Sequence, residues 1–267
     1  MTAIKNNVTW ITGASSGIGE ELAYQMAQKG GKLILSARRE SELQRVQAAI
    51  QEKWGTPVEI LPLDLLDNTA LPEKAKQAEA FFGRIDVLIN NGGISQRGLV
   101  NETIIEVDRK VFETNYFGSI TLTKAVLPGM LERKFGHHVA ISSTTGYIGT
   151  PLRSAYAASK HALHGFYDSM RAETYQDNVH VTIICPGFIN TPITYSALKA
   201  DGSKLNQMGD AQQKGLPVQV CAAKTIRAIE RNKNEAHISG PKEHLAILVM
   251  RFFPRLFAKM IRNIKST

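Results

Sequence analysis

Short apolar runs alternate with longer amphipathic stretches along most of this 267-residue chain. The apolar runs lack a polar/apolar alternation, which is typical of strands that are covered on both faces of a parallel sheet. The expected strands span 8–12, 32–36, 58–62, 87–90, 138–142, 179–185 and 236–238. The expected helices span 19–29, 41–53, 71–82, 107–133, 155–175 and 218–232. This order predicts one α/β domain with a doubly wound parallel sheet of about seven strands flanked by helices.

The composition is that of a soluble globular protein, with 43% hydrophobic and 21% charged residues. No apolar run reaches the roughly 18 residues that a membrane-spanning helix needs. The first expected strand begins at Val8, which leaves no room for a secretory signal. Cys185 and Cys221 are the two cysteines, far apart in sequence, as expected of buried thiols in a reducing compartment. We therefore expect a cytoplasmic protein.

The formal net charge is +8, and much of it gathers near the C-terminus at Arg251, Arg255, Lys259, Arg262 and Lys265. A basic chain suits a nucleic acid, an anionic membrane or an anionic cofactor. The sequence has no zinc-finger, RNA-recognition or helix-turn-helix pattern, so we expect no nucleic-acid partner. Its seven histidines include no HExxH or similar spacing, so we expect no metal site.

A glycine-rich turn, Thr12-Gly-Ala-Ser-Ser-Gly-Ile-Gly19, joins the first expected strand to the first expected helix. Glycine lets the backbone approach a pyrophosphate closely, and the following helix offers free N–H groups and a positive dipole end. The alternative is a glycine-rich helix cap with no ligand, because the spacing differs from GxGxxG. The predicted phosphate-binding residues are Gly13, Ser15, Ser16, Gly17, Ile18 and Gly19.

Two arginines, Arg38 and Arg39, follow the second expected strand. A dinucleotide site commonly has an acidic residue near this point for the ribose 2′-OH, whereas an arginine accommodates a 2′-phosphate. The pair therefore favours NADP(H) over NAD(H), unless both side chains are merely solvated. Asp64 and Leu65 follow the third strand, and Asp64 would bind the adenine amino group or cap a helix.

Polar residues also follow the fourth and fifth expected strands, as Asn90-Asn-Gly-Gly93 and Ser142-Ser-Thr144. Downstream comes Tyr156-Ala-Ala-Ser-Lys160, whose first and last residues share one face of a helix. A neighbouring ammonium favours the phenolate, bringing a phenol of pKa about 10 closer to working pH. Tyr195 and Lys199 have the same spacing, but they lack a serine-bearing strand end upstream, and we interpret them as coincidence.

The whole combination strongly resembles the short-chain dehydrogenase/reductase family from residue 8 to about residue 240. The motifs that carry the resemblance are Thr12-Gly-x3-Gly-Ile-Gly19, Asn90-Asn-Gly-Gly93, Asn115, Ser143, Tyr156-x3-Lys160 and Pro186-Gly-x3-Thr191. The resemblance implies a Rossmann-type fold and an oxidoreductase that moves a hydride between the nicotinamide and a carbonyl or secondary alcohol carbon. Substrate identity and reaction direction are not implied.

Four catalytic residues are implied by the resemblance. Tyr156 would be the general acid/base, and Lys160 would lower its pKa and hold the nicotinamide ribose. Ser143 would hydrogen-bond the substrate oxygen, and Asn115 would anchor a water chain that relays protons through Lys160.

Further cofactor contacts are implied at Asn90, Gly92, Tyr156, Lys160, Pro186, Gly187, Ile189 and Thr191. The family usually has alanine where Gly92 stands. Only a methyl is lost there, so we expect cofactor binding to persist.

Residues 191–215 are polar and punctuated by glycine, and we expect them to form a substrate lid on the catalytic unit 1–240. Residues 241–267 form a basic, amphipathic extension. Its stretch 245–264 suits either an anionic membrane surface or docking on the body or a neighbouring subunit, and we favour docking. Pro254 is expected to break this helix.

A homodimer or homotetramer is implied by the resemblance, with the helices at 107–133 and 155–175 as the expected interfaces. The alternative functions are a non-catalytic dinucleotide sensor and a membrane-surface binding protein on the same fold. The set Ser143, Tyr156 and Lys160 argues against them, since a pure binding protein needs no acid/base.

Overall fold

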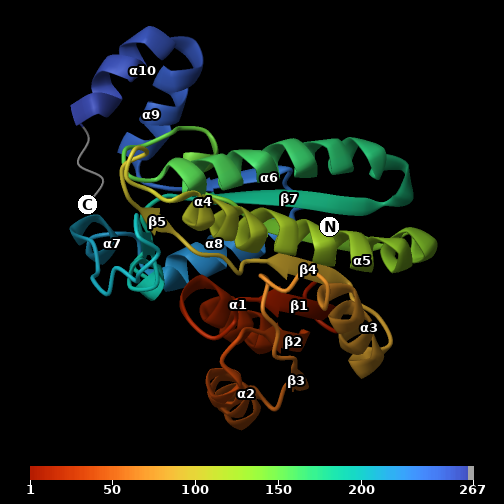
Figure 1. Cartoon of the computed structure of the whole chain (residues 1–267). Helices are drawn as coiled ribbons and strands as arrows, with labels where there is room; N and C mark the ends of the chain where they lie inside the picture. The colour runs from red at the N-terminus through yellow and green to blue at the C-terminus, as the bar shows by residue number, and fades with distance from the viewer. Residues whose placement is uncertain (264–267) are drawn as a thin grey trace.

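Seven strands form one parallel sheet in the order β3-β2-β1-β4-β6-β7-β9, which confirms the predicted fold class (Figure 1). The computed structural model describes residues 1–263, apart from the side chains of residues 210, 211 and 263. The strands are β1 (Val8–Thr12), β2 (Lys32–Ser36), β3 (Val58–Ile60), β4 (Val87–Asn90), β6 (Gly136–Ile141), β7 (Val179–Pro186) and β9 (Glu235–Ile238).

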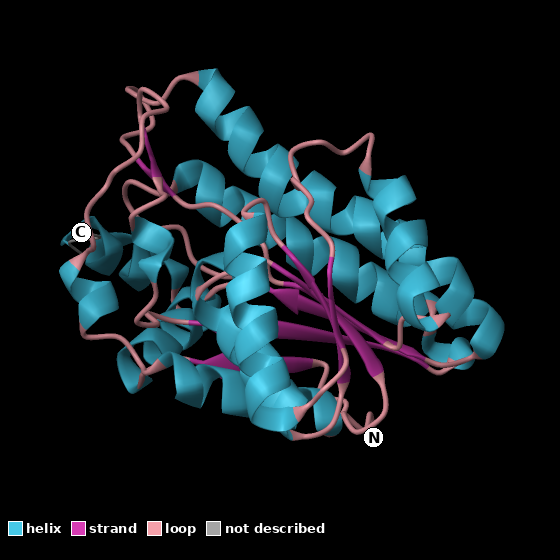
Figure 2. Cartoon of the chain, turned by 90° about the horizontal axis from the view of Figure 1, so that it is seen from below, coloured by secondary structure: helices cyan, strands magenta, loops and turns pink. Residues whose placement is uncertain are grey.

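Helices cover both faces of the sheet (Figure 2). The first face carries α1 (Gly17–Gln28), α2 (Glu40–Trp54) and α8 (Val218–Glu230), whose apolar side chains cluster with Ile11 of β1. The second face carries α3 (Leu71–Phe82), α5 (Gly118–Arg133) and α6 (Ser154–Glu173), and the α3 and α5 side chains pack with Trp10. Neighbouring strand residues thus point to opposite faces, which explains the unbroken apolar runs.

The predicted helix 107–133 is two helices joined by a π-helical turn. After α4 (Ile105–Phe112), the turn spans Glu113–Phe117 and leads directly into α5. Such turns insert one residue into a helix and are frequent at functional sites. Here the turn contains Asn115, whose buried side chain bonds outside its own helix.

Two short strands, β5 (Gln96–Arg97) and β8 (Leu198–Lys199), pair in a small parallel sheet that the sequence pattern did not predict. They join the chain after β4 to the segment 191–215. That segment also holds the 3-10 turn Pro192–Thr194 and the short helix α7 (Asp210–Gln213). It is thus fixed near the carboxyl end of the sheet, and its closure as a lid stays a prediction.

The C-terminal extension forms α9 (Pro241–Phe252), α10 (Pro254–Met260) and a 3-10 turn, Ile261–Asn263. Pro254 stands in the first turn of α10, so the break expected at this proline is confirmed. Ile247 and Phe257 pack against Ile148 of the main body. Residue 264, the end of the predicted amphipathic stretch, and Lys265 lie outside the described residues.

Candidate active site

Two adjoining cavities lie where the strands of the main sheet end. The first, of about 410 Å³, is lined by Gly13, Ser15, Ser16 and residues that follow β2 and β3. The second, of about 400 Å³, is lined by Ser143, Tyr156 and Lys160. Ile18, Asn91, Gly93, Thr191 and Ile193 line both cavities. They therefore form one continuous crevice at the position where open α/β sheets bind ligands.

The glycine-rich turn shapes the first cavity. Gly13 and Gly17 have positive φ angles of 66° and 59°, which side-chain-bearing residues rarely adopt. A Cβ at Gly13 would lie 2.8 Å from Gly92 Cα, so a larger residue would also push the two turns apart. Ser16 caps α1 without a side-chain hydrogen bond, which leaves first-turn N–H groups for a ligand. A phosphate group of a dinucleotide fits this arrangement.

Arg38 and Arg39 lie on the rim of the first cavity and are exposed. Neither forms an ion pair with a carboxylate in the described part of the chain, so both guanidinium groups are available to an anionic ligand. Asp64 and Leu65 line the same cavity. Asp64 Oδ1 accepts a hydrogen bond from the Leu66 N–H at 3.0 Å, so the carboxylate also orders its own turn.

Not every predicted cofactor residue faces the crevice. Asn90 Nδ2 donates to Thr123 Oγ1 at 3.0 Å and to Tyr167 Oη at 2.9 Å, so its amide points into the core beneath α5 and α6. Gly19 packs against Gly13 and is absent from the cavity walls. The neighbouring Asn91, which the sequence reasoning did not single out, lines both cavities and donates to Thr12 O at 2.9 Å.

Gly92 lines the first cavity, and its space is already filled. A Cβ at this position would lie 2.6 Å from Leu65 Cδ1, so the Leu65 side chain occupies the place of the usual alanine methyl. Leu65 thus fills the space that the alanine methyl of the family pattern would take in the wall of the first cavity.

Tyr156 and Lys160 both point into the second cavity from the first turns of α6. The Lys160 ammonium lies 5.7 Å from the Tyr156 ring centre and donates to Ile141 O at 2.8 Å. The carbonyl thereby holds the buried ammonium at the carboxyl end of β6. The helical spacing of the two residues brings them together as the sequence predicts.

Ser143 follows β6 and lines the same cavity, with its hydroxyl close to the Tyr156 phenol. Its Oγ accepts a hydrogen bond from the Thr145 N–H at 3.2 Å and donates to Pro186 O at 3.5 Å. Pro186, Gly187, Ile189 and Thr191 also line this cavity, at the end of β7. The predicted substrate-side residues thus come from β6, α6 and β7.

Asn115 lies just behind these groups. Its Oδ1 accepts from the Ile94 N–H at 2.8 Å, and its Nδ2 donates to Ile94 O and to Ser159 Oγ, both at 3.0 Å. Ser159 precedes Lys160 on α6. The amide therefore joins the π-helical turn, the segment after β4 and the catalytic helix.

Burial dominates the acid–base properties of the site. It raises the pKa of Tyr156, against which Arg153, the Ser143 hydroxyl and Arg97 act in the opposite direction. Burial also lowers the pKa of Lys160 to about 8. The Ser143 hydroxyl and the two arginines thus favour the phenolate in addition to the nearby Lys160 ammonium, whose effect on the pKa of Tyr156 stays a prediction.

Arg97 and Arg153 line the second cavity, and the sequence reasoning did not find them. Arg97 lies in β5, and Arg153 immediately precedes α6. Neither residue belongs to a motif; the tertiary fold brings Arg97 to Tyr156, whereas Arg153 lies three residues before it at the start of α6. Tyr195 and Lys204 similarly line the first cavity from the segment 191–215. Lys199 lines neither cavity, so Tyr195 and Lys199 form no second catalytic pair in the crevice.

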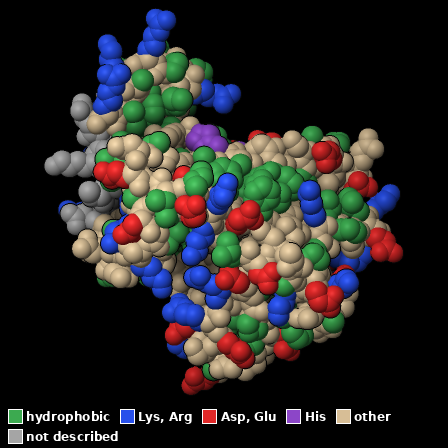
Figure 3. Space-filling model, in the orientation of Figure 1, with side chains coloured by type: hydrophobic (Ala, Val, Ile, Leu, Met, Phe, Trp, Pro, Cys, Tyr) green, Lys and Arg blue, Asp and Glu red, His purple; other side chains and the backbone are tan. Residues whose placement is uncertain are grey.

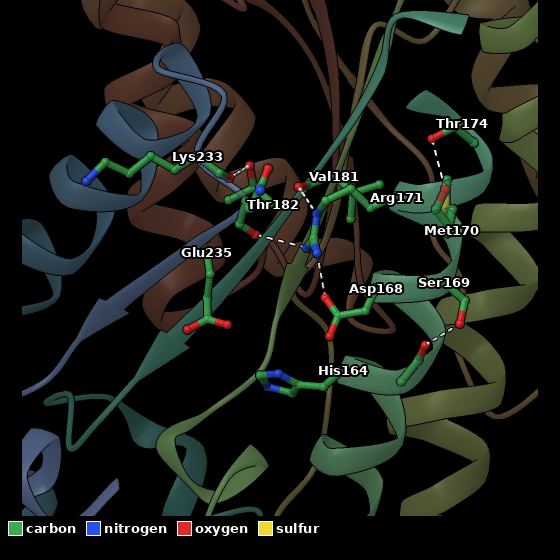
Figure 4. A network of polar contacts seen from close by, with 12 residues as sticks. His164, Asp168, Ser169, Met170, Arg171, Thr174, Val181, Thr182, Lys233 and Glu235 are labelled. Carbon is green, nitrogen blue, oxygen red and sulfur yellow. Dashed lines mark hydrogen bonds and ion pairs between the residues drawn. The ribbon is translucent and has the colours of Figure 1, made fainter. Parts of the chain in front are cut away.

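The far half of α6 is anchored to the sheet by Arg171 (Figure 4). Its Nε donates to Val181 O at 3.2 Å and its Nη2 donates to Asn234 O at 3.0 Å. Its Nη1 pairs with Asp168 at 2.5 Å. Because α6 carries Tyr156 and Lys160, these bonds fix the position of both side chains relative to β7 and β9.

A cluster of potential metal ligands lies beneath α6, formed by His164, Cys185 and Glu235, whose ligand atoms lie within 4.8 Å of one another. His164 Nε2 bonds to Ser142 Oγ at 2.9 Å, and Glu235 is bonded to Tyr147 and His237. These partners already engage the imidazole and the carboxylate. No spacing signal marks the cluster because its members come from α6, β7 and β9, and the expectation of no metal site stays a prediction.

The comparison with protein-family models decides the family. Residues 7–202 match the model described as short chain dehydrogenase. The chain belongs to the short-chain dehydrogenase family. Dehydrogenase/reductase SDR family protein 7-like of Anopheles gambiae is 42% identical over 258 residues, covering 95% of this chain and 81% of the relative. Dehydrogenase/reductase SDR family member 7B of Bos taurus is 40% identical over 266 residues, covering 97% and 82%.

Solved structures of short-chain dehydrogenases superpose closely on this one. An enzyme from Streptomyces avermitilis shares 29% identity with a TM-score of 0.82, covering 97% of this chain and 98% of that chain. A protein from Burkholderia phymatum, solved in complex with NAD, shares 24% identity with a TM-score of 0.83, covering 100% and 99%. This short-chain dehydrogenase is therefore an oxidoreductase with a nicotinamide-dinucleotide-binding fold.

Proposed function

We propose that the protein is an NADP(H)-dependent oxidoreductase that interconverts a carbonyl and a secondary alcohol. The observation that carries the proposal is the meeting of Ser143, Tyr156 and Lys160 in a cavity continuous with the glycine-lined one. Gly13, Ser15, Ser16, Gly17 and Ile18 would hold the pyrophosphate, and Arg38 with Arg39 would hold the 2′-phosphate. When bound, the reduced nicotinamide supplies the hydride.

The chain's own residues handle the proton and the oxygen. In reduction, Tyr156 donates its phenolic proton to the substrate oxygen, and in oxidation the phenolate takes the alcohol proton. Ser143 donates a hydrogen bond to the same oxygen and stabilises the negative charge that develops there. Lys160, held by Ile141 O, supplies a buried positive charge next to the phenol. Asn115 keeps the lysine-bearing helix in place through Ser159.

The proposal is tested by following NADPH consumption with purified protein and a panel of ketones and aldehydes. We expect turnover of at least one carbonyl class, with NADH used less well. NADPH binding without turnover of any carbonyl or alcohol would instead support a dinucleotide sensor and would contradict the proposed enzyme.

We further propose a cytoplasmic homodimer or homotetramer formed through the helical stretches 107–133 and 155–175. Both cysteines are free and buried, as suits a reducing compartment. Phe117 is 43% exposed at the end of the π-helical turn, where a second copy would cover it. Sedimentation equilibrium at micromolar concentration is expected to give a multiple of the monomer mass, and a monomer would contradict the assembly.

The extension docks on the body through Ile247 and Phe257, as the sequence favoured, and we also propose that the uncovered remainder of α9 and α10 contacts an anionic membrane surface without crossing it. Most of the apolar side chains on these helices are left uncovered by the main body, at Leu245, Leu248, Met250, Phe252, Phe253, Leu256 and Met260. Figure 3 shows apolar side chains and Lys/Arg side chains together on this protruding part. Within residues 1–263, no helix is long and apolar enough to span a bilayer. A surface-bound amphipathic helix fits these observations.

A further inference from the structure

Two arginines face the substrate cavity beside the proposed acid. Arg153 precedes Tyr156 by three residues and is only 6% exposed. Arg97 lies in β5 and lines the same cavity. Both charges act electrostatically on the Tyr156 phenol, so both lie near the point where the carbonyl would react.

Neither guanidinium has a carboxylate partner among residues 1–263 whose side chains are described. Arg153 Nε and Nη2 are buried without any hydrogen-bond acceptor, and the group lies 5.4 Å from the Phe188 ring centre. Arg97 Nη1 donates to Ser95 Oγ at 2.9 Å and to Gln96 O at 2.8 Å, which are neutral acceptors. Burying charges without a counter-ion is costly, and proteins retain such charges mainly where a ligand completes them.

The two charges also oppose each other. Burial lowers the pKa of Arg97 to about 10, and the nearby Arg153 contributes to this decrease. Folding therefore brings two positive charges together in a buried place, where their repulsion disfavours the charged forms. An anion placed between them would remove both penalties at once.

The rest of the cavity wall does not neutralise the charges of Arg97 and Arg153. Its other charged residues are Lys160, Lys242 and Glu243. The Glu243 carboxylate lies between Gly187 and Gly240, since a Cβ added to either glycine would be 3.2 Å from its Oε1 or 2.7 Å from its Oε2. Its carboxylate forms no ion pair with either arginine. Cations thus exceed anions on the described wall of the cavity.

We propose that Arg97 and Arg153 bind an anionic group, a carboxylate or a phosphate, on the carbonyl substrate. This inference rests on the proposed function, because it names the substrate class of the same site. A guanidinium grips either anion in a bidentate manner, which would orient the carbonyl toward Ser143 and Tyr156. Apolar walls such as Ile148 and Ile193 would cover an uncharged portion of the substrate.

The test compares paired substrates of which only one carries the anionic group. One pair is an aromatic keto acid and its primary amide, and the other is a hydroxyketone and its phosphate ester. For the wild-type protein with saturating NADPH, we expect kcat/KM to be about tenfold or more higher for the anion in at least one pair. The pair that shows the preference identifies carboxylate or phosphate. Equal kcat/KM values within both pairs would overturn the proposal.

Variants Arg97→Gln and Arg153→Gln assign the preference to these residues. We expect each to lower kcat/KM for the anion by at least about tenfold more than for the neutral partner, because the loss of the anion contact adds to any effect on the pKa of Tyr156 that both substrates share. An effect through the pKa of Tyr156 would lower kcat/KM for both substrates by the same factor. Equal losses of kcat/KM would therefore contradict anion binding. The matched control is Arg231→Gln, a change at an exposed arginine that lines neither cavity. It should leave kcat/KM unchanged for the anionic and the neutral substrate.

A binding measurement separates this inference from the proposed function. With NADP⁺ saturating the first cavity, benzoate and inorganic phosphate are titrated by thermal shift. A rise in Tm in the wild type that is absent in Arg153→Gln supports the site even if no substrate is turned over. If the protein turns over neutral ketones alone and neither anion raises its Tm, the anion site is contradicted. The oxidoreductase proposal would still hold.

Discussion

Arg38 and Arg39 are the residues on which the proposed cofactor choice depends. They are exposed at the rim of the first cavity and form no ion pair with a carboxylate of the described chain. We predict that Arg38→Gln raises the Kd of NADP⁺ by about tenfold or more, because a charge-assisted phosphate contact is lost. Isothermal titration with NAD⁺ provides the control, for which the Kd should change less than about threefold. Equal weakening of both dinucleotides would exclude the 2′-phosphate role.

The residues of the site differ in how far the sequence could predict them. Tyr156 and Lys160 were found because helical spacing places them on one face and a serine-bearing strand end lies upstream, which the equally spaced Tyr195 and Lys199 lack. Ser143 was found because it ends a strand at the edge where ligands bind. Arg97 carried no such local signal, since its approach to Tyr156 depends on how β5 and the start of α6 fold together; Arg153, three residues before Tyr156, had a usable spacing that the sequence analysis did not use. The sequence likewise did not predict that the Asn90 side chain points into the core, because its hydrogen-bond partners Thr123 and Tyr167 are remote in sequence.

At the scale of elements, the prediction succeeded where burial controls the pattern. The seven strands of the main sheet were located to within two residues at either end, because most of them are short apolar runs buried on both faces. The strands β5 and β8 were missed, since they have two residues each and their pairing is long-range. The π-helical turn was missed because it continues the same helical periodicity and is stabilised by bonds from Asn115 to other segments.

The central strand β6 carries two adjacent buried histidines whose situations differ. His137 bonds to Thr2 Oγ1 at 2.9 Å and to Thr182 Oγ1 at 2.8 Å, whereas both ring nitrogens of His138 lack a partner within the described residues. Burial lowers the pKa of each to about 3. The unfolded chain therefore binds more protons than the folded one between about pH 3 and 6.5. Stability is fully present above pH 6.5 and falls as the pH drops through this range.

We predict that His138→Leu raises the free energy of unfolding by about 1–3 kcal/mol at pH 7.5, because two unsatisfied buried nitrogens are removed. It should also reduce the loss of stability toward pH 4. Urea denaturation at several pH values measures both effects. His137→Leu is the matched control and should destabilise the protein, since it breaks two buried hydrogen bonds. Equal destabilisation by the two substitutions would contradict this account of β6.

The whole molecule has two parts with different surfaces, a catalytic body and the helical extension α9–α10. The extension packs on the body through Ile247 and Phe257, while Phe252 and Phe253 are 66% and 63% exposed. Its residues Lys242, Glu243, Ala246 and Ile261 also line the substrate cavity. A surface that binds a membrane would therefore adjoin the wall of the second cavity.

We predict that the double variant Phe252→Ser/Phe253→Ser weakens binding to phosphatidylserine-containing vesicles by about tenfold or more, because two aromatic side chains no longer enter the interface. Co-sedimentation of the full chain measures the binding. Phe81→Ser, at a 40% exposed phenylalanine on α3, is the matched control. Unchanged vesicle binding in the double variant would indicate that the extension docks on another subunit instead.

The central claim, that Tyr156 exchanges the proton with the substrate oxygen, is tested most directly by Tyr156→Phe. The substitution removes one oxygen from α6 and leaves the first cavity intact. With a carbonyl that the wild type reduces, we predict a fall in kcat of about 10²- to 10⁴-fold with the Kd of NADPH unchanged within about threefold. Turnover within tenfold of the wild-type rate would contradict the account.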